Sequence, residues 1–324
     1  MTRGAVLLVL AFSLSLLAPV ASGEQTKSVP VLGILMAAAA PNDALVQSLR
    51  VGLREFGYVE GQNIRFEYRG AQGHAERLPQ LAQDLVRLKV DVILCGAGAS
   101  IRAAKQATST IPILAVIYDE DPVASGLIGS LNHPGGNLTG IYQRQLQLAG
   151  KRLALLKQAL PHVSRVAVFW DSFGPRELAE FKAAAPSLGI ALEPIELRAP
   201  YDFQAAYRLA KRRRAGAVIL SFSPVFYAER TRLGALGLEN GIPVMSQVRD
   251  TTLAGGFMSY GHEWSDSWHR FAYFVDRLLK GGKAGDLPVE QVDTLKLVVN
   301  VRTATKLGFT VPQSMLLQAD EVVQ

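Results

Sequence analysis

Residues 165–221 read RVAVFWDSFGPRELAEFKAAAPSLGIALEPIELRAPYDFQAAYRLAKRRRAGAVILS. Three short apolar stretches, at 165–170, 190–197 and 217–221, have the length and residue types of strands buried on both faces. Helical stretches at 175–188 and 203–214 separate them. This alternation predicts βαβ units, in which right-handed crossovers join the parallel strands of one sheet.

The same alternation extends in both directions along the chain. Strands are expected at 29–36, 63–69, 90–95, 111–117 and 242–245, and helices at 42–56, 74–88, 100–108, 146–160 and 226–240. Asn42 or Asp43 is placed to cap the first of these helices. The stretch 63–69 alternates apolar and polar residues, which is typical of a strand near a sheet edge. Two such series predict an α/β protein with two doubly wound, Rossmann-like lobes, each built on a parallel sheet.

Three clusters of turn-forming residues suggest where the chain passes between the lobes. They are NHPGGNLTG at 132–140, GGFMSYG at 255–261, which leads into a helix at 264–280, and the stretch 281–287. The last strand, 295–301, is expected to join the second lobe. We therefore expect a first lobe of residues 27–138 plus 260–284 and a second lobe of 139–259 plus 285–324, joined by a three-strand hinge.

Residues 1–23 have the pattern of a secretory signal peptide. Arg3 precedes an apolar run at 5–18, and the small residues Ala21, Ser22 and Gly23 follow. The run is shorter than the roughly 20 residues that a transmembrane helix needs. We expect cleavage near Gly23 and a periplasmic mature chain; a permanent membrane anchor is the alternative. A lipid anchor is not expected, because no cysteine lies near the cleavage site.

Composition excludes several classes of protein. The chain is 49% apolar and 19% charged, which indicates a folded globular protein rather than a disordered one. A net charge of +6 invites a nucleic-acid interpretation, but the basic residues are dispersed, and the one dense run, 211–214, ends a predicted helix. We therefore expect no nucleic-acid partner. Cys95 is the only cysteine and follows an apolar strand, so it is expected to be a small buried side chain.

Cofactor and metal motifs are missing from the sequence. Gly96 and Gly98 begin a dinucleotide-like pattern, but Ile101 stands where its third glycine belongs. There is no phosphate loop, no H-E-x-x-H, no C-x-x-C and no G-x-S-x-G. His262 and His269 could share a face of one helix, but a metal site would need further ligands. We expect no cofactor, no metal and no catalysis.

An acidic cluster, Asp119, Glu120 and Asp121, follows the strand at 111–117. Two of its carboxylates could serve an enzyme as acid and base. One could instead accept a cationic or N–H group of a ligand. In a third interpretation, Asp121 caps the short helix that starts at Pro122. Capping and ligand contact can coexist.

A set of short motifs, in a fixed order, resembles one family over nearly all of the chain. They are GLREFGYVEGQNI (52–64), LVRLKVDVI (85–93), ATSTIPI (107–113), Asp121-Pro122-Val123, PGGNLTG (134–140), GKRL (150–153), MSYG (258–261) and LPVEQ (287–291). The chain resembles the substrate-binding proteins of ABC uptake systems that have a type I periplasmic-binding fold, the group with tryptophan- and tyrosine-binding members. The resemblance implies two α/β lobes that close around a small solute and are then read by a membrane permease.

The candidate contacts lie where ligands bind in open parallel sheets, beyond the carboxyl ends of the strands. The loop 96–100 precedes a helix N-terminus and is expected to bind a carboxylate, unless it is only a tight turn. Asp121 is our choice for a solute amino group, and Trp170 is expected either to stack on a planar solute or to pack. The full set is Ala97, Gly98, Ser100, Tyr118, Asp119 and Asp121 from the first lobe, Trp170, Asp171, Ser223, Phe226, Gln247 and Asp250 from the second, and Thr139, Tyr142 and Tyr260 at the crossings.

One departure from the family pattern concerns the loop after the first strand, AAAAP at 37–41. Family members often have a serine there, so the alanines remove a hydroxyl and put a simple transfer of tryptophan specificity in doubt. The expected function is a monomeric, periplasmic solute-binding protein for an amino acid or an aromatic or carboxylated compound, with an ABC permease as partner. The alternatives are the ligand-binding part of a membrane sensor, and a secreted hydrolase or lyase that uses Asp119 or Asp121.

Overall fold

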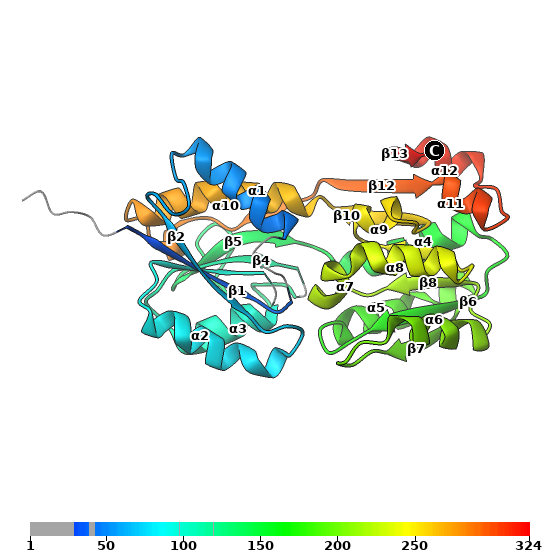
Figure 1. Ribbon diagram of the computed structural model, residues 1–324, viewed down its shortest axis with the longest axis horizontal. Coiled ribbons are helices and arrows are strands. Elements are labelled where there is room, and N and C mark those ends of the chain that lie inside the picture. The colour runs from blue at the N-terminus through cyan, green and yellow to red at the C-terminus, as the bar shows by residue number, and fades with distance from the viewer. Residues whose placement is uncertain (1–28, 39–42, 97, 119) are drawn as a thin grey trace, which may run out of the picture.

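The computed structural model describes residues 29–38, 43–96, 98–118 and 120–324. Its strands form two sheets that lie side by side along the long axis of the molecule (Figure 1). Each sheet is covered by helices on both faces, which is the doubly wound α/β architecture that the alternation predicts. The expected signal peptide, residues 1–23, lies outside the described residues. Within the described part of the chain, every helix is too short or too polar to cross a bilayer.

The first sheet has six strands in the order β11-β5-β4-β3-β1-β2, and every neighbouring pair is parallel. The strands are β1 (Val31–Met36), β2 (Arg65–Gly70), β3 (Val92–Cys95), β4 (Ile113–Ile117), β5 (Leu138–Gln143) and β11 (Glu290–Val292). Helices α1 (Ala44–Glu55) and α10 (Trp264–Leu279) cover one face, and α2 (Leu78–Arg87) and α3 (Gly98–Ala107) the other (Figure 1). The Asp43 carboxylate accepts the Leu45 N–H and caps α1, as expected. Strand β2 is at the edge, also as expected.

The second sheet has seven strands in the order β13-β12-β10-β9-β8-β6-β7, and only the β10–β12 pair is antiparallel. The strands are β6 (Arg165–Trp170), β7 (Ala191–Glu196), β8 (Ala217–Leu220), β9 (Val244–Ser246), β10 (Met258–His262), β12 (Leu295–Asn300) and β13 (Glu321–Val323). Its helices are α4 (Ala149–Ala159), α5 (Pro175–Ala184), α6 (Phe203–Arg212), α7 (Pro224–Ala228), α8 (Arg230–Glu239), α9 (Arg249–Leu253), α11 (Val301–Lys306) and α12 (Gln313–Gln318). Four 3-10 turns, at Ala75–Arg77, Leu146–Leu148, Pro186–Leu188 and Ala284–Asp286, complete the elements of the described chain.

The chain passes between the sheets at three places, each shifted from its expected position. The turn cluster at 132–140 leads into β5, which pairs with β4 in the first sheet, so the first crossing follows Gln143. The second lies between β10 and α10, after His262. The third lies between β11 and β12, at 293–294, and not at 281–287. The glycines at 135–136 and at 281 adopt the positive φ of turns within one lobe, which is why turn-forming residues misplaced the crossings.

Candidate functional site

Aromatic rings from both sheets meet between the two lobes. Tyr118 follows β4 in the first sheet, and Phe222 follows β8 in the second. Their ring centroids are 4.0 Å apart. Trp264, the first residue of α10, stacks on Phe222 with centroids 5.2 Å apart and planes 10° apart, and lies 5.3 Å from Tyr118. We call Tyr118, Phe222 and Trp264 the ring stack. It is buried where the carboxyl ends of the two parallel sheets come together, the place where such sheets bind ligands.

The lobes are closed on one another in this structure. Phe222, Tyr227 and Val248 follow strands of the second sheet, yet they pack in the same core cluster as the residues of β1 and α10. These three side chains have to leave the first-lobe core when the lobes open. The stack is therefore part of the cleft and part of the core at once.

A small cavity of about 100 Å³ borders one side of the ring stack. Gly98 and Ala99, at the N-terminus of α3, and Pro175, at the N-terminus of α5, line it. The cavity therefore lies beside two helix N-termini, and a helix N-terminus carries positive partial charge and N–H groups without a partner in the helix. The cavity is also lined by Arg102 of α3 and Arg176 of α5.

Glu120 ties these two arginines together across the cleft. Its buried carboxylate accepts from Arg102 Nη1 at 2.6 Å and from Arg176 Nη1 at 3.1 Å. One arginine comes from each lobe, so this ion pair also holds the lobes closed. Both guanidinium groups line the small cavity, and guanidinium groups donate strong hydrogen bonds to anionic groups.

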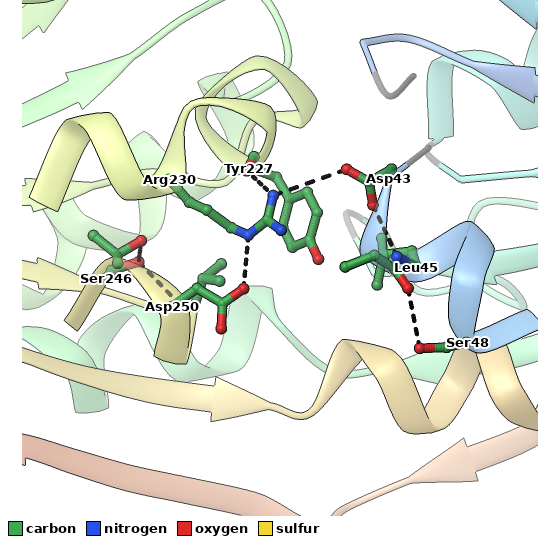
Figure 2. Close-up of polar contacts among 10 residues, drawn as sticks. Asp43, Leu45, Ser48, Tyr227, Arg230, Ser246 and Asp250 are labelled. Carbon is green, nitrogen blue, oxygen red and sulfur yellow. Dashed lines mark hydrogen bonds and ion pairs between the residues drawn. The ribbon is translucent and has the colours of Figure 1, made fainter. Parts of the chain in front are cut away.

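A larger cavity, of about 410 Å³, borders the ring stack through Trp264. Its lining includes Leu45 at the start of α1 and Tyr227, Asp250 and His262 from the second lobe. Beside it, Arg230 forms a second cross-lobe ion pair (Figure 2). Its guanidinium lies over the Tyr227 ring, donates to Asp250 at 2.8 Å and approaches the Asp43 carboxylate at 3.8 Å.

Several buried polar atoms near the cleft have no hydrogen-bond partner among the described residues. They are Ser100 Oγ in the first turn of α3, Gln247 Oε1 after β9, Trp264 Nε1 and His262 Nε2. A buried polar atom without a partner loses about 1–3 kcal/mol relative to one that is satisfied. A polar solute that reached these atoms could supply the missing hydrogen bonds.

Asp171, at the end of β6, organises the second-lobe wall of the cleft. Its fully buried carboxylate accepts from the Ser223 hydroxyl, from Tyr201 Oη at 3.0 Å and from the Phe173 N–H at 3.0 Å. Burial raises the pKa of Asp171 to about 6, although these three hydrogen bonds oppose the rise. Ser223 in turn caps α7 by accepting from the Val225 and Phe226 N–H groups. Asp171 and Ser223 thus position the loop that carries Phe222.

The structure brings together some of the predicted site residues. Tyr118 is in the ring stack, Gly98 lines the small cavity, Asp250 lines the large one, and Ser100 and Gln247 have unpartnered buried atoms among the described residues. Ala97 and Asp119 lie outside the described residues. The proposed contacts of all of these with a solute remain predictions.

Other predicted site residues hydrogen-bond or pack within the lobes. Thr139 donates its hydroxyl to the Leu287 carbonyl at 2.8 Å, and Tyr142 of β5 is buried in a core cluster of the first lobe. Phe226 packs among Tyr201 and Phe203 in a second-lobe core. The remaining two, Trp170 and Tyr260, pack against the core on the α4 and α5 side of the second sheet.

Asp121 is exposed and caps a turn. Its Oδ1 accepts from the Val123 and Ala124 N–H groups, both at 2.9 Å. This is the capping interpretation of the acidic cluster. Asp121 lines neither of the two cavities beside the ring stack.

The sequence reasoning missed Phe222, Trp264, Arg102, Arg176 and Arg230. A signal exists for three of them, because Trp264 and Arg176 lie in the first turn of a helix that follows a strand and Phe222 lies in the loop just before such a helix. Histidine positions were also misjudged, since His262 ends β10 while His269 lies in α10. No group of three or more potential metal ligands occurs among the described residues.

Two doubly wound lobes, three crossings and a cleft between facing strand ends define the class of type I periplasmic binding proteins. The chain belongs to the family described as "ABC transporter substrate binding protein", whose model matches residues 30–323. It is therefore a solute-binding protein of an ABC transport system, and the resemblance seen in the short motifs is confirmed.

Individual proteins are similar to this chain in sequence or in fold. A protein named "Tyrosine-binding protein" from Clostridioides difficile is 24% identical over 263 residues, which is 79% of this chain and 74% of the relative. A conserved domain protein from Vibrio cholerae has a similar structure, with a TM-score of 0.79, 25% identity and coverage of 91% of this chain and 99% of that one. A Streptococcus pneumoniae ABC domain solved in complex with L-Trp has a TM-score of 0.78 and 23% identity, with coverage of 91% and 100%.

Proposed function

We propose that this protein binds a small aromatic carboxylate, such as an aromatic amino acid, between its lobes and delivers it to an ABC permease. The observation that carries the proposal is the small cavity beside the ring stack, where two helix N-termini and two arginines converge. Such a site favours a carboxylate, because N–H groups and guanidinium groups both donate to it. The names of the tyrosine-binding and L-Trp-bound relatives agree with this solute class.

The aromatic part of the solute would contact the ring stack. Phe222 and Trp264 present nearly parallel ring faces, and a planar group can stack on such faces or slide between them as the lobes move. The small cavity, of about 100 Å³, suits a carboxylate, and Tyr118 and Phe222 of the ring stack line it, so an aromatic group attached to that carboxylate would lie against these rings.

The protein would act outside the cytoplasm as a monomer, after removal of residues 1–23, and would do no chemistry. The sequence pattern of that segment supports export. The exposed capping role of Asp121 gives no support to an acid–base pair.

Thermal unfolding of the mature chain, stripped of solute by unfolding and refolding, tests the proposal. The panel is L-tryptophan, L-tyrosine, benzoate and indole-3-propionate, with tryptamine as the analogue that lacks the carboxylate. A solute at 100 times its Kd adds about 2.7 kcal/mol to the free energy of unfolding. We expect a rise in Tm with at least one carboxylate and none with tryptamine.

Two variants sharpen the test. Arg176→Met should abolish the rise in Tm, whereas Arg165→Met, which removes an arginine that pairs with Glu193 at the far end of β6, should leave it intact. If no carboxylate raises the Tm, the solute class is wrong. If tryptamine raises it as much as L-tryptophan does, the carboxylate site is wrong.

A further inference from the structure

A fully buried ion pair lies behind the cleft in the second lobe. Arg152 of α4 donates to Glu177 in the first turn of α5, and their side chains are 0% and 3% exposed. A buried ion pair is seldom the most stabilising choice, since apolar side chains of similar volume often do as well or better. The groups that Arg152 and Glu177 hold in place therefore indicate what this ion pair does.

Glu177 reaches the cleft. One of its carboxylate oxygens accepts from Arg152, and the other accepts the main-chain N–H of Phe222. Phe222 is the second-lobe member of the ring stack, and its ring packs in the first-lobe core. The carboxylate therefore fixes the backbone from which that ring projects.

Arg152 reaches two of the three crossings. It donates to the side-chain Oε1 of Gln145 at 3.0 Å, to the main-chain oxygen of Gln145 at 3.1 Å and to the main-chain oxygen of Tyr260 at 3.4 Å. Gln145 is the second residue after β5, where the chain leaves the first sheet, and Tyr260 lies in β10, just before the chain returns. One guanidinium thus holds both segments.

We propose that Arg152 and Glu177 are positioning residues that couple the Phe222 ring to the crossing segments, so that release of Phe222 from the first lobe and bending of the crossings occur together. Opening the lobes withdraws Phe222 from the first-lobe core and changes the backbone at the crossings. A rigid, buried connection between the two makes these changes one concerted step. This inference concerns the lobe motion and is independent of which solute binds.

The test removes both charges together, because removing one alone leaves an uncompensated buried charge. In Arg152→Met with Glu177→Gln, the amide oxygen can still accept the Phe222 N–H, but the link to the crossings is lost. The matched control is Arg165→Met with Glu193→Gln, the same pair of substitutions at an ion pair that touches neither the cleft nor the crossings.

The readout is the distance between nitroxide labels on Gln106→Cys of α3 and Lys182→Cys of α5, both exposed, measured by double electron–electron resonance without added solute. Cys95 is buried and should not be labelled. We expect the Arg152/Glu177 variant to have a broader distribution and a several-fold larger population of open conformers than the wild type, with the control unchanged. A wild-type distribution together with a lowered Tm would overturn the proposal, because it would show a purely structural role.

If the double variant does not fold, Arg152→Lys replaces it. The lysine keeps the charge opposite Glu177, but a single ammonium cannot reach Gln145, Tyr260 and Glu177 with the spread of a guanidinium. The same broadening is expected for Arg152→Lys, and a wild-type distribution in this variant would refute the coupling.

Discussion

Replacing Asp171 with asparagine should remove a pH-dependent part of the stability of this protein. The carboxyl group is fully buried, and burial raises its pKa to about 6 from an ordinary value of 3.8. The folded protein therefore holds this proton more tightly than the unfolded chain. The resulting stabilisation is complete below about pH 4 and is lost as the pH rises through about 6. A difference of about two between the pKa values corresponds to about 3 kcal/mol.

The assay is urea unfolding of wild type and Asp171→Asn at several values between pH 4 and pH 8. The free-energy difference between the two proteins should fall by about 3 kcal/mol over this range, since subtraction cancels the other carboxyl groups. Asp202→Asn is the control, because the Asp202 carboxylate also accepts a main-chain N–H group but is exposed. A difference that stays constant with pH, or one that grows toward pH 8, would show that folding does not raise the pKa of Asp171.

Three other substitutions give separate tests of the fold and the cleft. Gly140→Ala should lower the free energy of unfolding by about 3 kcal/mol or more in chemical denaturation, because φ is 142° and a Cβ would overlap the main chain of Ala115. Gly136→Ala is the control: φ is 62° and the space around it is open, so the loss should be only about 1–2 kcal/mol. Trp264→Ala should lower the free energy of unfolding by about 3–5 kcal/mol, and a loss below about 1 kcal/mol would mean that the ring stack is not packed in solution. Arg230→Met should lower the free energy of unfolding by about 1–3 kcal/mol, because Asp250 loses its ion-pair partner and the Arg230 side chain is only 14% exposed. High salt should reduce this difference between variant and wild type.

The elements of the fold were predictable where the apolar pattern is continuous. Strand β6 spans the expected residues 165–170, and β8 ends within one residue of its expected end. The central residues of β6 and all four residues of β8 are apolar and buried, so both strands differ clearly from the flanking helices.

The crossings were not predictable in the same way. Glycine and proline mark a turn, but they do not say which sheet the next strand joins. The pairing of β5 with β4 and of β11 with β5 depends on contacts between distant parts of the chain. The expected boundaries therefore placed β5 and β11 in the second lobe, although both strands belong to the first sheet.

The site was predictable at the level of loops but not of side chains. Sequence reasoning found the strand ends that border the cleft, because ligands bind there in parallel sheets. Asp171 and Asp121 were expected to contact the solute, and in the structure both accept hydrogen bonds from neighbouring N–H or hydroxyl groups. The sequence reasoning overlooked Arg102 and Arg176, whose long side chains reach the cleft from the first two turns of α3 and α5.

The ring stack sets a condition on any solute that binds in the cleft. Tyr118, Phe222 and Trp264 already bury one another in the closed protein, so a solute that only replaces these apolar contacts gains little free energy. The gain has to come from groups for which closure supplies no partner among the described residues, such as Ser100 Oγ and Gln247 Oε1. A site that hydrogen-bonds its ligand rejects analogues that lack the matching group far more strongly than an apolar pocket rejects a change of size. The polar atoms around the ring stack therefore determine which aromatic solutes bind, and the rings provide an apolar surface that any of these solutes can contact.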